Sequence, residues 1–275
     1  MSENKLHNEA GMPAARLFNE QGQAPVVLVC EHASNRFPTS YQALGLNDAA
    51  RQSHAAWDPG AQAVAETLAM MLDARLVEST VSRLVYDCNR PPEDQSAMPA
   101  RSELFDIPGN RDLGAAERAR RVRMVYEPFR DLLAETLRTP PTPRALITIH
   151  SFTPVYMGDP RDVEIGVLHD RDSRVADAMM ATAPAHTRLR VERNAPYGPA
   201  DGVTHTLKEH GLKNDLLNIM LEIRNDLIKT PEAQREMAAM LAHWLAAALA
   251  SQGVVLQVAE PLNTIPKELG CRSSS

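Results

Sequence analysis

Short apolar runs alternate along this chain with stretches whose apolar residues are spaced as on one face of a helix. The runs that predict strands lie at 24–31, 75–80, 145–149, 163–168, 189–192 and 216–223. The stretches that predict helices lie at 61–74, 113–137, between 168 and 189, and at 231–251. Because strands and helices alternate, we expect a three-layer α/β/α sandwich with a mixed, largely parallel sheet.

Helix boundary signals support this assignment. Asp58-Pro59-Gly60 precedes the first predicted helix, with Asp58 where an N-cap belongs and Pro59 at the first helical position. Asp226 or Thr230 stands near the start of the last helix, and the helix over 113–137 ends before two prolines. Residues 91–111, rich in Pro, Asp, Ser and Gly, predict an excursion over the surface.

The chain is expected to form one domain. Its 275 residues fall within the size that open α/β enzymes reach as a single unit, and no internal repeat or linker divides them. We expect one catalytic domain over 15–262, with loose termini at 1–14 and 263–275.

Composition narrows the range of partners. The formal net charge of −6 argues against a nucleic-acid or anionic-membrane partner, because both require a basic face. The sequence has neither a signal-like apolar segment nor a run near the ~20 residues that span a bilayer, so we expect a cytoplasmic protein. Cys30 and Cys88 lie in apolar runs far from Cys271 and from each other, which predicts buried thiols rather than a CxxC metal site.

Three of the predicted core strands end in clusters of polar groups suited to catalysis. These clusters are Glu-His-Ala-Ser-Asn at 31–35, His-Ser-Phe at 150–152 and Glu-Ile-Arg-Asn at 222–225. In open α/β sheets the ligand crevice lies at the carboxyl ends of strands, so residues remote in sequence converge there. Two histidines with nearby carboxylates have the ligand types of a catalytic zinc site that keeps one position open for water.

Each of these residues also has a purely structural interpretation. A histidine after a strand is commonly a hydrogen-bonded structural residue, and Glu222 within an apolar run is either salt-bridged, for example to Arg224, or a general base. Asn89-Arg90 beside two prolines suits a carboxylate anchor, although a surface arginine is the commoner case. Four further histidines lack such a context and are expected to be structural or exposed: His54, His169, His205 and His210.

Motifs of other enzyme classes are missing from the sequence. The phosphate-binding P-loop, the GxGxxG dinucleotide fingerprint and the GxSxG nucleophile elbow do not occur. Nucleotide binding and serine hydrolysis are therefore disfavoured.

An ordered set of sequence blocks resembles the N-formylglutamate amidohydrolase family. The blocks are VCEHASN (29–35), AWDPGA (56–61), SR (82–83), DCNRP (87–91), IHSF (149–152), RNAPY (193–197) and LEIRNDL (221–227). Each block is weak evidence alone, but all occur in order between about 24 and 250. The family is related in fold to the zinc carboxypeptidases, so the resemblance implies a zinc-carboxypeptidase-like sandwich.

The resemblance also implies residue roles. His32 and His150 would be metal ligands, and Glu222 would activate metal-bound water. Arg83 is the candidate oxyanion stabiliser. The implied substrate-binding residues are Asn89, Arg90, Tyr197 and Arg224.

The third metal ligand departs from the pattern of the related carboxypeptidases. They carry His-x-x-Glu, whereas this chain has Asn35 at the last position, and asparagine is a poor zinc ligand. Asp58 is the preferred replacement, and a role as a helix cap is the alternative. The cofactor expected is a divalent metal ion, with zinc favoured.

The resemblance thus predicts a metal-dependent amidohydrolase that removes the N-formyl or another small N-acyl group from an acidic amino acid. N-formyl-L-glutamate, an intermediate of histidine degradation, is the leading substrate. The second carboxylate of such a substrate needs a further cation, for which Arg161, Arg193 and Arg224 are open choices. The alternatives are a carboxypeptidase-like or cell-wall peptide amidase, and a non-catalytic amino-acid-binding domain with a degenerate metal site. The sequence does not determine the oligomeric state.

Overall fold

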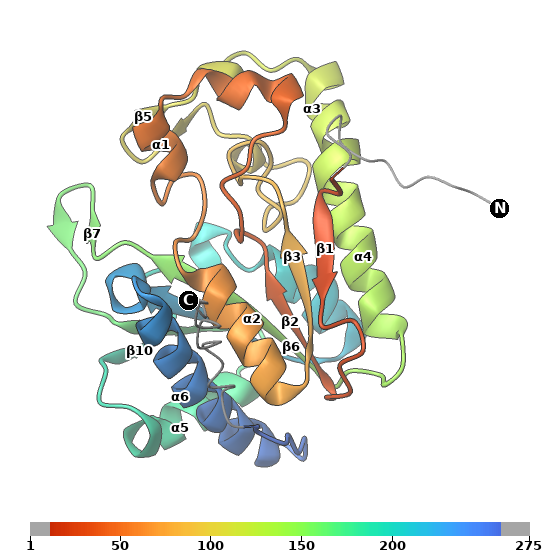
Figure 1. Ribbon diagram of the computed structural model, residues 1–275, viewed down its shortest axis with the longest axis vertical. Coiled ribbons are helices and arrows are strands. Elements are labelled where there is room, and N and C mark those ends of the chain that lie inside the picture. The colour runs from red at the N-terminus through yellow and green to blue at the C-terminus, as the bar shows by residue number, and fades with distance from the viewer. Residues whose placement is uncertain (1–11, 260–275) are drawn as a thin grey trace, which may run out of the picture.

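The computed structural model describes residues 12–259 and has the expected three-layer architecture (Figure 1). Residues 1–11 and 260–275 lie outside the described part, which includes most of the segment 1–14 and all of the segment 263–275 that were expected to be loose, as well as Cys271. Ala14, assigned to a loose terminus, is instead buried. No helix between residues 12 and 259 has the length and apolar character needed to cross a membrane.

The central sheet is mixed, with a parallel core. Its seven strands lie in the order β1 (Ala15–Phe18), β3 (Arg75–Ser79), β2 (Val26–Cys30), β6 (Ala145–Phe152), β11 (Leu217–Arg224), β9 (Ile165–Leu168) and β10 (Val191–Arg193). The four strands from β3 to β11 are parallel. β1 pairs antiparallel with β3, and β9 pairs antiparallel with β11. β10 pairs parallel with β9. The short edge strand β1 lacked a signal of its own in the sequence.

Helices cover both faces of the sheet. One face carries α2 (Ala61–Leu72), α5 (Arg174–His186) and α6 (Pro231–Ala250), whose buried Ala, Leu, Val and Met side chains pack on alternate strand residues. The other face carries α3 (Ala115–Arg121), a π-helical turn (Val122–Tyr126) and α4 (Glu127–Arg138), which form the predicted helix over 113–137 as one continuous rod. Cys30 and Cys88 are buried free thiols, as expected.

The remaining elements are short and lie mostly in the connections. They are α1 (Asp48–Gln52), the hairpins β4 (Arg101–Ser102)–β5 (Phe105–Asp106) and β7 (Val155–Tyr156)–β8 (Asp159–Pro160), a second π-helical turn (Leu207–Gly211), and 3-10 turns at Thr39–Gly45, Gln95–Ala97, Pro108–Asn110, Pro199–Asp201, Leu212–Asn214 and Asn225–Ile228. The β7–β8 hairpin projects from the body of the molecule (Figure 1).

Two helix starts differ in how well the sequence foretold them. Thr230 caps α6 as expected, because its side chain accepts a hydrogen bond from the Ala233 amide. The assignment of Asp58 as the cap of α2 is wrong. The N-cap is Gly60, whose φ of 83° suits glycine, and no side chain caps this helix. The Asp58 carboxylate is thereby free to point elsewhere.

Strand alternation determines which polar residues share a face. In β6, Ile147 and Ile149 pack under α2 and α6, so Thr148 and His150 point to the opposite face. By the same alternation Glu222 of β11 leaves that face, and His150 and Glu222 are direct partners in the β6–β11 register.

Candidate metal and catalytic centre

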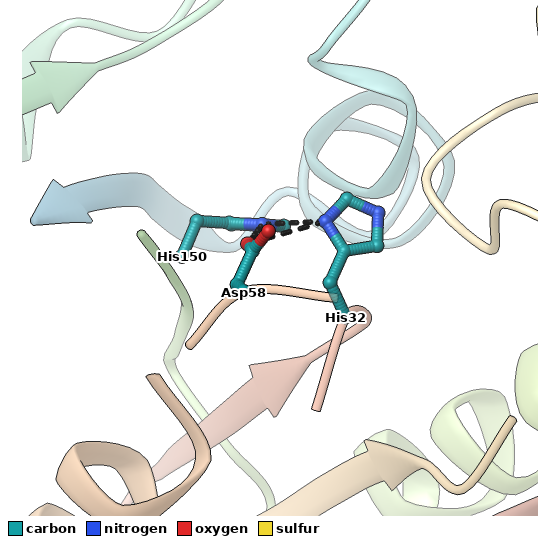
Figure 2. Close-up of side chains that lie close together, drawn as sticks. All are labelled: His32, Asp58 and His150. Atoms are coloured by element: carbon teal, nitrogen blue, oxygen red, sulfur yellow. Dashed lines mark hydrogen bonds and ion pairs between the residues drawn. The ribbon is translucent and has the colours of Figure 1, made fainter. Parts of the chain in front are cut away.

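Two histidines and one aspartate converge at the carboxyl ends of β2 and β6. One ligand atom from each of His32, Asp58 and His150 lies within 4.8 Å of the other two, and all three residues are buried (Figure 2). The Oδ2 atom of Asp58 is 2.9 Å from Nδ1 of His150 and 3.3 Å from Nδ1 of His32. The two Nδ1 atoms are 3.1 Å apart, so both rings aim the same nitrogen at one point.

The other nitrogen of each ring faces a carboxylate. Nε2 of His32 is 2.7 Å from Asp87, and Nε2 of His150 is 3.1 Å from Glu31. A carboxylate at Nε2 favours the tautomer that carries its proton there, which leaves the Nδ1 lone pair for a metal. This pairing of imidazole with carboxylate is typical of metal-bound histidines, so the residues present fit a divalent cation.

The charges of the cluster call for a cation at the same place. Burial opposes ionisation of Asp58, yet the two imidazoles hold its pKa well below the usual range. Burial likewise opposes ionisation of Asp87 and Glu31, whose pKa values His32, Arg83 and His150 lower. Ionised carboxylates around two imidazoles favour positive charge at the point where the rings meet.

Asp58 completes the cluster, whereas Asn35 lies outside it. The Asn35 amide donates to the backbone oxygen of Arg51, 3.3 Å away. Asp58 is held by the Ser151 amide, which donates to its Oδ2 over 3.2 Å. Of the two candidates for the third ligand, Asp58 therefore has the suitable position.

Glu222 lies beside the cluster as an isolated carboxyl group. It is buried and lines the same cavity, and its Oε2 atom has no hydrogen-bond partner among the described residues. Burial raises its pKa to about 7, against the opposing effect of His150. The salt bridge to Arg224 suggested as an alternative is not formed, because Arg224 bonds to Asp226 and Glu164. A carboxyl group with this pKa has the property expected of a general base near neutral pH.

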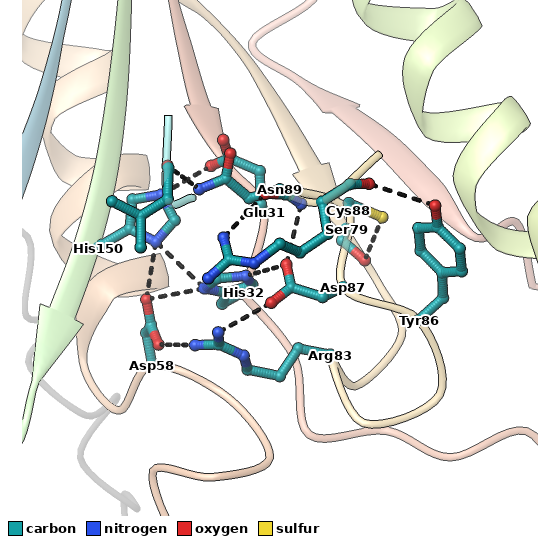
Figure 3. Close-up of polar contacts among 12 residues, drawn as sticks. Glu31, His32, Asp58, Ser79, Arg83, Tyr86, Asp87, Cys88, Asn89 and His150 are labelled. Carbon is teal, nitrogen blue, oxygen red and sulfur yellow. Dashed lines mark hydrogen bonds and ion pairs between the residues drawn. The ribbon is translucent and has the colours of Figure 1, made fainter. Parts of the chain in front are cut away.

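Arg83 links the candidate ligand Asp58 to the outer carboxylate Asp87. Its guanidinium donates to Asp87 over 2.8 Å and lies 3.5 Å from Asp58 (Figure 3). Arg83 also lines the cavity, so its remaining N–H groups are available to a reacting oxygen.

A cavity of about 580 Å³ opens over the cluster. Its lining combines residues at strand ends with residues from four connections, at 54–58, 83–103, 156–161 and 196–203. Glu31 and Asp87, which pair with the two histidines, were given no role by sequence reasoning. The sequence signal that could have found them is their position beside predicted site residues. Glu31 directly precedes His32, and Asp87 lies two residues before Asn89. His54, which was expected to be structural or exposed, lines the cavity 3.7 Å from Asp58.

The connections at 96–103, 153–161 and 196–206 contribute to the cavity lining and are called its cover here, and Asn89 and Arg90 bond to the last of them. The Asn89 amide donates to the Val203 carbonyl over 2.6 Å and accepts from the Thr206 amide over 3.0 Å. Arg90 lines the cavity, yet its guanidinium donates to the carbonyls of Gly202 and Asp201. Their predicted role as a substrate anchor would require an exchange of these partners.

The other two predicted substrate residues have different positions. Tyr197 lines the cavity, where burial raises its pKa to about 12. Arg224 is not among the cavity-lining residues, and its guanidinium is bonded to Asp226, Glu164 and the Arg161 carbonyl.

Comparison with known proteins decides the family. The family model named N-formylglutamate amidohydrolase matches residues 24–229. The chain belongs to the N-formylglutamate amidohydrolase family. It is accordingly a hydrolase that acts on an amide bond.

Solved structures extend the match across most of the chain. A gene product from Agrobacterium tumefaciens is 51% identical, with a TM-score of 0.87 over 90% of this chain and 99% of that one. An N-formylglutamate amidohydrolase from Ralstonia eutropha is 16% identical, with a TM-score of 0.61 over 88% and 98%, and supports the family fold. Among curated proteins, no sequence matches this chain.

Proposed function

We propose that this amidohydrolase is metal-dependent and removes the N-formyl or another small N-acyl group from an acidic amino acid such as N-formyl-L-glutamate. The convergence of His32, Asp58 and His150 beside the buried Glu222 is the observation that supports this proposal. Such a substrate is consistent with a cytoplasmic enzyme of histidine degradation. The alternative of a non-catalytic binding domain rested on Asn35, which is a poor metal ligand. Because Asp58 supplies a carboxylate to the cluster, that argument no longer supports the alternative.

His32, Asp58 and His150 would hold the cation. A divalent cation, with zinc favoured by two nitrogen donors and one carboxylate, would polarise the scissile carbonyl and lower the pKa of water in the open position. Glu31 and Asp87 would keep the two imidazoles in the tautomer that binds it.

Glu222 acts as the proton carrier in this proposal. Its carboxylate takes the proton of the attacking water and returns it to the nitrogen of the leaving amine. Arg83 donates hydrogen bonds to the oxygen of the former carbonyl as negative charge develops there. The pairing of Arg83 with Asp87 fixes the guanidinium before substrate binds.

Glu222→Gln tests the assignment of the base. This change keeps the shape of the side chain but removes its basicity, so formate release from N-formyl-L-glutamate should fall on the order of 10²–10⁴-fold. Zinc content by elemental analysis should equal that of the wild type. Glu103→Gln is the matched control, because Glu103 lines the same cavity, and should change turnover by no more than a few fold. Normal turnover in Glu222→Gln would exclude Glu222 as the base, and an inactive wild type would exclude the substrate class.

A further inference from the structure

The cavity is lined by four arginines that differ in what their guanidinium groups contact. Arg83 is bonded to Asp87, and Arg90 donates to backbone carbonyls of the cover. Arg101 is exposed at the rim. Arg161 is half-buried, and none of the ion pairs among residues 12–259 includes it.

Three aromatic rings surround the guanidinium of Arg161. Its central carbon lies over the rings of Tyr156 at 4.4 Å, Tyr197 at 4.8 Å and Phe152 at 5.7 Å. Its contact with the Thr153 carbonyl is long, at 3.5 Å. The Arg161 side chain also hydrogen-bonds to Tyr197, and a guanidinium has five N–H donors, so others can donate to a planar acceptor. A charge-assisted hydrogen bond made there is stronger than one between neutral groups.

The backbone of Arg161 is bonded to the end of the strand that carries Glu222. Its amide donates to the Pro154 carbonyl over 2.8 Å, and its carbonyl accepts from Arg224 over 3.2 Å. Arg224 ends β11 two residues after Glu222 and is itself bonded to Asp226. The backbone of Arg161 is therefore tied to the end of the strand that carries Glu222, and both residues line the same cavity.

Neither of the other candidate cations has these properties. Arg193 is ion-paired with Asp177 and is not among the cavity-lining residues. Arg224 is bonded to two carboxylates outside the cavity.

We propose that Arg161, within the sleeve formed by Phe152, Tyr156 and Tyr197, binds the side-chain carboxylate of the substrate and thereby selects N-acyl dicarboxylic amino acids over neutral ones. The inference rests on the proposed deacylation, since it names the residue that reads the amino-acid part of that substrate. Tyr156 belongs to the projecting β7–β8 hairpin, so the hairpin contributes one wall of the specificity pocket (Figure 1).

Arg161→Met tests this role in two ways. In kinetics, kcat/KM for N-formyl-L-glutamate should fall on the order of 100-fold, the loss expected when a charged hydrogen-bonding partner is removed. The value for N-formyl-L-glutamine should stay within about threefold, because that substrate lacks the second carboxylate. Arg101→Met removes the same charge from the same cavity and should preserve the glutamate-to-glutamine ratio. Arg161→Lys should recover part of that ratio, since it keeps the charge but loses the planar fork.

Calorimetric binding separates this inference from the proposed reaction. Glutarate has the two carboxylates and carbon spacing of glutamate, and butyrate lacks one carboxylate. The wild type should bind glutarate more tightly than butyrate, and Arg161→Met should abolish that difference whether or not N-formyl amino acids are substrates. An unchanged difference in both Arg161 variants would overturn the inference. Equal losses for glutamate and glutamine substrates, with metal content intact, would also overturn it.

Discussion

The strand ends and the cover of the cavity differ in how their residues are held in place. His150 and Glu222 are paired with each other at the ends of β6 and β11, and Glu31 and His32 directly follow the parallel strand β2, so the sheet limits the movement of their backbone. The cover comes from the connections at 96–103, 153–161 and 196–206, which lie outside the central sheet and are held by local backbone bonds and by side-chain contacts such as those of Asn89. The difference assigns the reaction centre to the rigid sheet and the choice of substrate to the loops.

Loss of a strand-borne ligand should have the largest effect. His150→Ala removes one of three ligands, so the purified protein should lose its zinc and at least about 10³-fold of its turnover. Elemental analysis beside the wild type measures the first quantity and formate release the second. His54→Ala is the control, because it removes a histidine of the same cavity that lies outside the cluster, and it should keep its zinc. Undiminished zinc in His150→Ala would show that the metal is held elsewhere.

Loss of the charge on a carboxylate that pairs with a metal-binding histidine should have an intermediate effect on zinc binding. Asp87→Asn keeps the shape of the partner of His32 but weakens its preference for one tautomer, so zinc affinity should fall about 10–100-fold. Competition with a chelator measures this affinity. Turnover at saturating zinc should fall far less than in His150→Ala. An unaltered affinity would mean that Asp87 serves only to hold Arg83.

A change in the cover should have the smallest effect on the chemistry. Asn89→Ala leaves the Val203 carbonyl and the Thr206 amide without their partner, so the segment at 201–206 loosens and kcat/KM should fall about tenfold. Zinc content should not change. Asn110→Ala is the matched control, because Asn110 is also buried and joins loops by donating to Leu84 and Pro99, but it does not line the cavity. Its unfolding free energy should fall with kcat/KM intact. A comparable kinetic loss in both variants would reduce Asn89 to a stabilising residue.

The strand-borne half of this comparison was the more predictable from sequence. Apolar runs located five of the seven sheet strands within about two residues, and the blocks around His32, His150 and Glu222 indicated the cluster. A run that is buried on both faces does not reveal which face a residue occupies, so the partnership of His150 with Glu31 was invisible. Asp58 illustrates the same difficulty, since its place before a helix suggested a cap whereas its carboxylate contacts two remote histidines.

For the cover of the cavity, the sequence predicted a surface loop from its composition but not which residues face the cavity. Residues 91–111 were recognised as an excursion, but Ser96, Arg101 and Glu103 became cavity residues through contacts that no local pattern encodes. Arg161, Arg193 and Arg224 were equivalent in sequence. They differ in structure. Arg193 is ion-paired with Asp177, and Arg224 is ion-paired with Glu164 and Asp226. Arg161 instead packs against aromatic rings. The contacts of these arginines were thus decided by the folded arrangement of neighbours near and far in the chain.

The register between β6 and β11 has a consequence for how such an enzyme diversifies. His150 and Glu222 are opposite each other in a ladder of eight paired residues, and a slip by one residue would turn either side chain to the far face. Insertions or substitutions in the hairpin and the loops leave that ladder untouched. Descendants of this chain can therefore acquire new acyl or amino-acid preferences by small changes at the mouth of the cavity, while the proposed base and the proposed ligand are inherited as one aligned pair.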